Sequence, residues 1–187
     1  MKTFYVLPGW TESQRHARKF KAAAIQKGLK EAKTPQQADI LITHSAGCYL
    51  VPAGSRASLI MLINPSYNLK GSPFLRQFND IILGAPAQIR QWGIGNFLKI
   101  RYWNTSNIVL HFRRNMVDIV RHFKSDEVIL PAAARIIVVR NHGDRDLSPV
   151  AARIRKTNKH VGYLELPGLH EDCWFNPYPY IDLLKSA

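Results

Sequence analysis

Ser45 is the residue of this chain whose setting points most directly to chemistry. It follows an apolar run at residues 40–42, and residues 43–47 read Thr-His-Ser-Ala-Gly. A strand that turns sharply at a serine between small residues is typical of a nucleophile elbow, which lifts the hydroxyl clear of the sheet. A serine hydroxyl alone is a weak nucleophile, so a base, an acid that orients the base and oxyanion donors are also needed. The simpler alternative is a strand that ends in a loop, because Thr43 stands where the motif prefers glycine.

A candidate acid and a candidate base follow later in the chain. The β-branched run at residues 136–139 predicts a buried strand, and the loop after it contains Asp144 and Asp146. The Gly-x-x-Asp-x-x-Pro spacing of this loop favours Asp146 as the acid and leaves Asp144 in reserve. Residues 162–166 predict another short strand, and the loop after it carries His170. A serine, an aspartate and a histidine therefore each lie just past the end of a predicted strand.

This order resembles that of the α/β-hydrolase superfamily, in particular its small single-domain serine hydrolases. The resemblance is carried by the loops after Thr43, Asn141 and Gly168, and more weakly by residues 4–10 and 59–65. Residues 4–10 resemble the strand and loop that supply half of the family's oxyanion hole. Residues 59–65 resemble the strand that follows the elbow helix. The resemblance covers roughly residues 1–65 and 134–187 and leaves the middle of the chain unmatched.

The resemblance also implies the roles of individual residues. Ser45 would attack a carbonyl carbon, His170 would take the proton, and Asp146 would orient the imidazole. The backbone N–H groups of Trp10 and Ala46 would stabilise the oxyanion. The implied activity is carboxylesterase-like hydrolysis of a small-molecule acyl ester or thioester through an acyl-enzyme, without a cofactor or metal. Amidases and peptidases use the same triad and stay open as alternatives.

Other residues of reactive or metal-ligating types fit a functional site less well. Five residues are of metal-ligating types, but their spacing matches no familiar zinc pattern: His142, Asp144, Asp146, His170 and Asp172. The two cysteines, Cys48 and Cys173, argue against a disulfide scaffold. We expect Cys48 to be a small core residue and Cys173 to be a bystander. His44 is expected to shape the elbow, pointing away from the serine, rather than to serve as the base.

The pattern of the whole chain predicts one α/β domain over residues 1–187, with a reduced α/β-hydrolase fold. Apolar runs predict about five mostly parallel strands, at residues 3–8, 38–43, 58–64, 135–140 and 162–166. Helices are predicted at residues 11–33, 46–51 and 178–186, and after the Ser-Pro step at 148–149. The interval between Trp10 and Ala38 is interpreted as too short for the family's additional strand with its helix.

Residues 66–133 are predicted to form a helical, cap-like insertion between the third and fourth strands. The strongest helical pattern lies at residues 105–124, with Thr105 or Ser106 as N-cap. One interpretation is ordinary packing of this segment against the sheet. The other is that some of its aromatic and aliphatic residues roof an apolar substrate pocket: Phe74, Phe78, Ile89, Trp92, Phe97, Tyr102 and Trp103.

The chain is strongly basic, with 26 Lys and Arg against 13 Asp and Glu and a formal net charge of +13. Such a charge favours weak association with anionic membranes or polymers. No helix-turn-helix, zinc-finger or RNA-binding signature is present, so no specific nucleic-acid partner is predicted. A non-catalytic binding module of the same fold, acting through its basic surface, is the alternative to an enzyme. Residues 1–3 lead directly into a strand without a signal-peptide stretch, so we expect a cytoplasmic protein.

Overall fold

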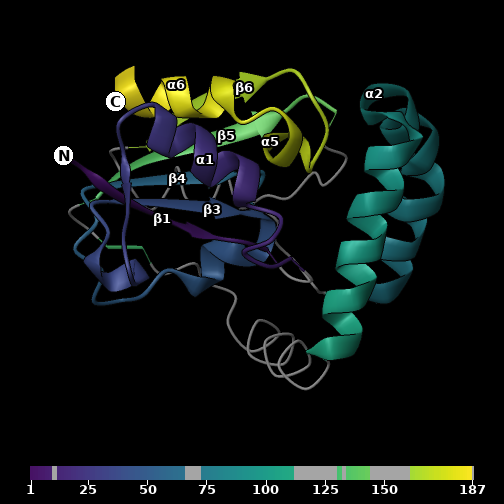
Figure 1. The fold of residues 1–187 in the computed structure, drawn as a ribbon, viewed down its shortest axis with the longest axis horizontal. Helices are drawn as coiled ribbons and strands as arrows, with labels where there is room; N and C mark the ends of the chain where they lie inside the picture. The colour runs from purple at the N-terminus through teal and green to yellow at the C-terminus, as the bar shows by residue number, and fades with distance from the viewer. Residues whose placement is uncertain (10–11, 66–72, 112–129, 132–133, 144–160, 187) are drawn as a thin grey trace.

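The computed structural model describes residues 1–9, 12–65, 73–111, 130–131, 134–143 and 161–186 (Figure 1). Within these residues, six parallel strands form one sheet in the order β2-β1-β3-β4-β5-β6. Their bounds are β1 Thr3–Leu7, β2 Lys30–Glu31, β3 Ile40–His44, β4 Leu59–Ile63, β5 Arg135–Asn141 and β6 Val161–Leu166. Because all strands run the same way, their carboxyl ends meet at one edge of the sheet.

The central strands β3 and β4 are continuous apolar runs, as expected for a parallel sheet that is covered on both faces. Every residue of both strands is buried. Their register pairs Ile42 with Met61 and His44 with Ile63, so the two strands end side by side. The residues that follow them, Ser45 and Asn64, therefore start their loops at the same edge.

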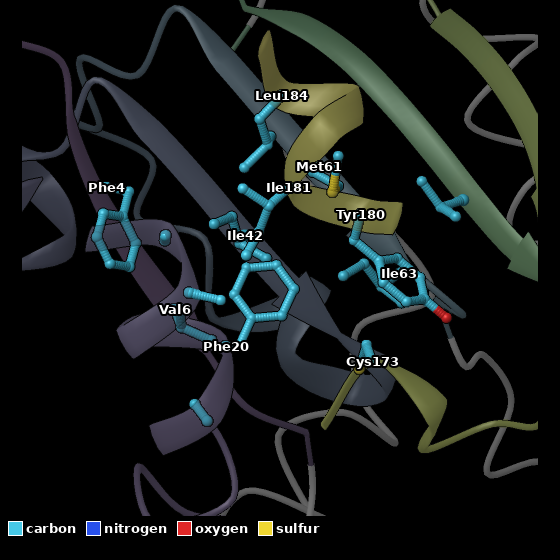
Figure 2. Close-up of a cluster of buried hydrophobic side chains, with 14 of the residues drawn as sticks. Phe4, Val6, Phe20, Ile42, Met61, Ile63, Cys173, Tyr180, Ile181 and Leu184 are labelled. Carbon is cyan, nitrogen blue, oxygen red and sulfur yellow. The ribbon is translucent and has the colours of Figure 1, made fainter. Parts of the chain in front are cut away.

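Helices α1 (Arg18–Gln26), α5 (Asp172–Phe175) and α6 (Tyr178–Ser186) cover one face of the sheet (Figure 1). Figure 2 shows the core beneath them, where Phe20 of α1 and Tyr180 and Ile181 of α6 pack on side chains of β1, β3 and β4. The 3-10 helices η1 (Pro35–Gln37) and η2 (Ser45–Leu50) are short, and η2 contributes Cys48 to the separate core of the opposite face. Each fully buried large apolar side chain contributes roughly 1.5–3 kcal/mol to stability.

Helix α2 (Pro73–Leu110) forms the described part of the insertion between β4 and β5. It is broken at Gly93, whose φ of 76° and ψ of 155° lie outside the helical region and suit a residue without a Cβ. The two halves lie alongside each other in Figure 1, and Arg101 of the second half donates a hydrogen bond to Gln88 of the first. No helix among the described residues is both long enough and apolar enough to cross a membrane.

The parallel α/β sheet with a helical insertion confirms the predicted fold class. The interpretation of the interval between Trp10 and Ala38 was wrong, because it holds α1 and the two-residue strand β2, which raises the sheet to six strands. The helix predicted at residues 11–33 is also too long. Residues 14–17 form turns, and α1 runs only from Arg18 to Gln26. The Glu12 side chain bonds instead to the Gly9 backbone N–H.

The start predicted for a helix at Thr105 or Ser106 is wrong as well. Both residues lie inside α2, which reaches them without interruption from Gly93. The apolar spacing that suggested a start there continues a helix that had already begun. Residues 112–129, which hold the rest of the predicted helix, lie outside the described residues, as does the helix predicted after residue 148.

Candidate active site

The turn at Ser45 has the backbone of a nucleophile elbow. Ser45 has a φ of 50°, a left-handed conformation that is uncommon for a residue other than glycine. It is the first residue of η2 and directly follows the extended residue His44 at the end of β3. Strained backbone of this kind persists only where the surroundings hold it. The serine side chain is partly exposed, whereas His44 is completely buried.

Glycines allow this turn to lie close to the loop after β1. A Cβ on Gly47 would lie 2.2 Å from the carbonyl oxygen of Leu7, which no side chain tolerates. A Cβ on Gly9 would lie 2.8 Å from the Cβ of Ser45 and 2.9 Å from the carbonyl oxygen of His44. The loop at Gly9 and the elbow are therefore packed backbone against backbone.

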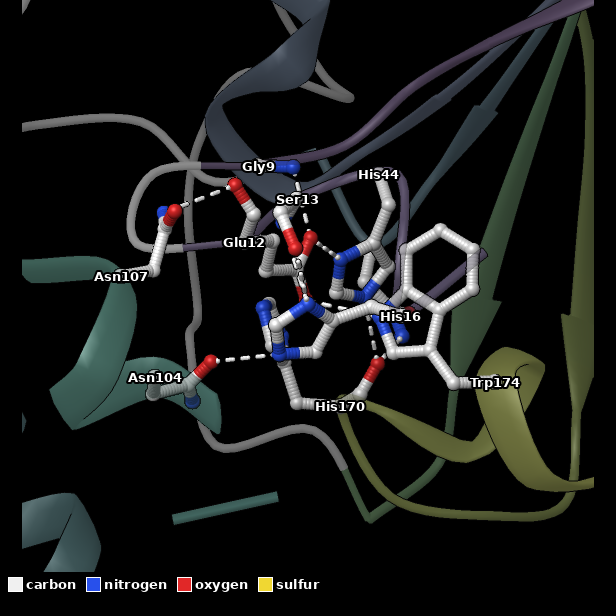
Figure 3. A network of polar contacts seen from close by, with 10 residues as sticks. Gly9, Glu12, Ser13, His16, His44, Asn104, Asn107, His170 and Trp174 are labelled. Atoms are coloured by element: carbon white, nitrogen blue, oxygen red, sulfur yellow. Dashed lines mark hydrogen bonds and ion pairs between the residues drawn. The ribbon is translucent and has the colours of Figure 1, made fainter. Parts of the chain in front are cut away.

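The loop that carries His170 is bound directly to the elbow strand. The backbone carbonyl of His170 accepts a hydrogen bond from His44 Nε2 at 2.7 Å and another from Asn64 Nδ2 at 2.7 Å. The rings of His44 and His170 have centroids 4.8 Å apart. Because His44 immediately precedes Ser45, these bonds bring the predicted base to the predicted nucleophile's end of the sheet (Figure 3).

A buried ion pair lies beneath this arrangement. His44 Nδ1 lies 2.8 Å from Glu12 Oε2, and the two side chains are 0% and 6% exposed. Both ring nitrogens of His44 thus face acceptors, a carboxylate and a carbonyl, so the geometry calls for a proton on each nitrogen. Burial raises the pKa of Glu12, but the positive charge and hydrogen bond of His44 outweigh it and lower that pKa to about 2.

Helix α2 contacts this site at His16, which lies just before α1. The Nδ1 atom of His16 accepts a hydrogen bond from the Ser13 backbone N–H at 3.0 Å, and its Nε2 atom lies 2.9 Å from Asn104 Oδ1 of α2. The Trp103 ring packs edge-on against the imidazole at 5.3 Å. Burial is the main cause that lowers the pKa of His16, and the bonds are those of a neutral ring that donates from Nε2. Asn107 adds a hydrogen bond from Nδ2 to the Glu12 carbonyl at 3.1 Å.

The end of β5 is hydrogen-bonded to the loop that carries His170. The backbone N–H of Asn141 donates to Asn64 Oδ1 at 2.8 Å, and Asn141 Nδ2 donates to the Leu169 carbonyl at 2.6 Å. Two residues further on, the Gly143 N–H donates to the Gly168 carbonyl at 2.8 Å. The loops after β4, β5 and β6 therefore converge where the elbow lies.

The cysteines have the core character predicted for Cys48. Cys48 and Cys173 are both completely buried. Burial raises the pKa of the Cys48 thiol to about 12 and raises that of Cys173 well above its usual value. A thiol in that state is a poor nucleophile at neutral pH because the thiolate is the reactive form.

Comparisons with known proteins bear on the fold. No family model matches the sequence, and no curated protein matches it. Among solved structures, a marine microorganism esterase has a TM-score of 0.64 at 12% identity, over 99% of this chain and 94% of that one. A serine hydrolase involved in carbazole degradation has a TM-score of 0.64 at 10% identity, over 100% of this chain and 90% of that one. A type II thioesterase from the yersiniabactin pathway has a TM-score of 0.57 at 14% identity, over 98% and 91%.

The fold is that of the α/β-hydrolases. Of the predicted site residues, Ser45 and Ala46 open η2, and the backbone carbonyl of His170 bonds to His44, the residue before Ser45. The predicted oxyanion donor Trp10 and the predicted acid Asp146, with its reserve Asp144, lie outside the described residues. Their roles stay predictions.

Metal-ligating side chains do not gather in the part of the chain that the structure describes. Of the residues considered for a metal, His142 pairs with Glu165 at 3.4 Å in an exposed position. Asp172 Oδ1 accepts hydrogen bonds from Gln91 at 2.7 Å and from Trp92 Nε1 at 2.8 Å. Those bonds anchor α5 to α2.

Sequence reasoning missed Glu12. In the sequence it belongs to a predicted helix start, and no local pattern marks the contacts of Gly9 and Glu12 with His44 at the end of β3. Asn64 was missed as well, although its place directly after an apolar strand was a usable signal. A polar residue at a strand's carboxyl end lies at the edge where α/β proteins bind ligands.

Proposed function

We propose that this chain is a serine hydrolase that cleaves a small-molecule carboxylic ester or thioester. The observation that supports it most is the left-handed Ser45 at the carboxyl end of β3, with the His170 loop hydrogen-bonded to the residue beside it. The α/β-hydrolase fold and its similarity to esterases and thioesterases support the same class. Amide and peptide substrates remain alternatives for the same chemistry.

The proposed reaction uses the hydroxyl of Ser45 as nucleophile. Its Oγ bonds to the acyl carbon while His170 takes the hydroxyl proton, and Asp146 orients the imidazole and stabilises its charge. The backbone N–H groups of Ala46 and Trp10 stabilise the oxyanion, each by roughly 3 kcal/mol in the transition state. The bond to the leaving alcohol or thiol then breaks, and the leaving group takes the proton from His170. Water then attacks the acyl carbon and gives up a proton to His170. The bond from that carbon to Ser45 Oγ breaks, Ser45 takes the proton back from His170, and the acid is released.

Ester turnover by a Ser45→Ala variant tests this proposal. Turnover of a short-chain activated ester should fall roughly 10⁴-fold or more, while the melting temperature stays close to that of the wild type. Ser58→Ala is the matched control, because Ser58 is an exposed serine just before β4 whose hydroxyl donates to the Asp39 carbonyl. Turnover that persists in the Ser45 variant would contradict the serine mechanism.

A second candidate function is binding of an anionic surface by α2, in place of catalysis. Exposed apolar side chains recur every fourth residue along this helix: Ile94, Leu98 and Tyr102. Residues 84–111 carry cations and no acidic residue: Arg90, Lys99 and Arg101. An apolar stripe among cations suits the surface of an anionic membrane. The basic residues considered at positions 113–124 lie outside the described residues.

Vesicle sedimentation tests this candidate. Wild-type protein should bind phosphatidylserine vesicles, should not bind phosphatidylcholine vesicles, and should dissociate as salt rises. Arg90→Gln with Lys99→Gln should weaken that binding without changing the melting temperature. Equal binding to both kinds of vesicle would remove the electrostatic basis of this candidate.

A further inference from the structure

Glu12 is a buried carboxylate at the candidate site that no step of the proposed reaction uses. We propose that Glu12 is a positioning residue: it holds the loop that precedes Trp10 and, through His44, the loop that carries His170. The inference rests on the proposed function, because it assigns Glu12 to the same reaction. It concerns the placement of catalytic groups, since Glu12 itself does not contact the reacting atoms.

The first support is the hydrogen bonding of the carboxylate. Glu12 Oε2 accepts from the Gly9 backbone N–H at 2.6 Å and from His44 Nδ1 at 2.8 Å (Figure 3). Glu12 Oε1 accepts from Trp174 Nε1 at 2.7 Å. An ionised carboxylate only accepts hydrogen bonds, so each of the three donors around Glu12 finds an acceptor there. One oxygen atom therefore fixes the separation between Gly9 and the His44 ring.

The second support is the continuation of this contact through His44. Its Nε2 donates to the His170 carbonyl at 2.7 Å, on the side of the ring opposite to Glu12. Glu12 is the acceptor on the Nδ1 side of the ring, so it fixes the orientation in which Nε2 meets the His170 carbonyl. The His170 loop then depends on a carboxylate that it does not touch.

The third support is the place of these groups along the chain. Gly9 precedes the predicted oxyanion donor Trp10, and His44 precedes the nucleophile Ser45. The Glu12 carboxylate thus joins two segments of the proposed machinery directly, and His44 extends the connection to the His170 loop. Misplacement of catalytic groups by about 1 Å can slow a reaction roughly 100-fold. Loss of this charge should therefore act on the rate of the chemical step.

Kinetics of a Glu12→Gln variant test the inference. The glutamine amide turns one acceptor into a donor that faces an N–H group, and it removes the charge opposite His44. We expect kcat for a small ester to fall roughly 100-fold, with KM within about threefold of the wild type. Ser45 should still react with a fluorophosphonate, more slowly than in the wild type.

Two variants separate positioning from general destabilisation. Glu31→Gln makes the same chemical change on β2, where Glu31 pairs with Lys21 away from the site. This variant should leave kcat and KM unchanged. Trp174→Phe removes the bond to Oε1 and leaves both bonds to Oε2, so kcat should fall less than about fivefold. If Trp174→Phe lowered kcat as much as Glu12→Gln at equal melting temperature, Glu12 would have only a stabilising role.

A double-variant cycle tests whether Glu12 and His44 act as one unit. His44→Gln should lower kcat about as much as Glu12→Gln, and the double variant should be little worse than either, because both changes break the same chain of bonds. Losses that multiply would overturn the proposed connection.

Hydrogen exchange provides a measurement that does not depend on catalysis. In Glu12→Gln, exchange should accelerate about tenfold or more in peptides covering residues 4–9 and 167–171 together, and not in the Glu31 variant. Unchanged exchange in either segment would contradict the positioning role. If exchange accelerates in both segments while the wild type neither turns over esters nor reacts with the fluorophosphonate, the proposed hydrolase function is wrong. The connection between Glu12 and the two loops still holds in that case.

Discussion

Two histidine–glutamate pairs lie at or near the carboxyl ends of strands of this sheet, and they differ mainly in their surroundings. His44 and Glu12 lie 2.8 Å apart with side chains 0% and 6% exposed, whereas His142 and Glu165 lie 3.4 Å apart with side chains 63% and 43% exposed. The buried pair has further partners on both residues, in Gly9, Trp174 and the His170 carbonyl. The exposed pair is screened by water and salt. The same two residue types therefore anchor loops only where water is excluded and every remaining polar group is matched.

Removal of the buried histidine should have the largest effect on stability. His44→Ala leaves the Glu12 carboxylate buried without its charge partner, which costs about 3–5 kcal/mol. Chemical denaturation monitored by tryptophan fluorescence measures the change in unfolding free energy. His142→Ala is the matched control, and a similar loss in both variants would erase the distinction between the two pairs.

Acid stability should report the charge of Glu12. Its pKa is lowered from 4.5 to about 2, so its stabilising contribution is fully present above about pH 4.5 and is lost as pH falls towards 2. The shift corresponds to about 3 kcal/mol. Denaturation between pH 2 and 6 should therefore show a steeper acid limb for wild type than for Glu12→Gln. Parallel limbs would mean that Glu12 is not ionised in the folded protein.

Disruption of the exposed pair should have the smallest effect. Glu165→Gln should change the unfolding free energy by no more than about 0.5 kcal/mol, because both charges are largely hydrated. The same denaturation measurement at low and at high salt checks this, and any small effect should shrink as salt rises. A loss of several kcal/mol would show that exposure does not decide the strength of these pairs.

The sequence predicts the parts of this molecule that depend on local pattern. The apolar runs of β3, β4 and β5 and the serine turn were predicted because a buried parallel strand and an elbow each leave a contiguous signature. The order of Ser45 and His170 along the chain sufficed to place both at one edge of the sheet. The two-residue strand β2 has no such signature, since it consists of Lys30 and Glu31.

The Glu12–His44 pair could not be predicted in the same way. The two residues are 32 positions apart, and their contact depends on how the loop after β1 folds over the end of β3. In the sequence, Glu12 resembles part of a helix start. Only the folded structure shows that Gly9 and His44 share its carboxylate. The break of α2 at Gly93 is a similar case, because the helical pattern continues on both sides of it. Tertiary contacts decide the first feature, and the non-helical backbone of one glycine decides the second.

Reaction with a fluorophosphonate, followed by peptide mapping, asks directly whether Ser45 is an activated nucleophile. We expect one covalent adduct per chain, on Ser45, formed in the wild type and in Ser58→Ala but absent from Ser45→Ala. The rate of adduct formation should rise with pH through the range in which a histidine loses its proton. An adduct on another residue, or an unreactive Ser45 in the folded wild type, would contradict the account.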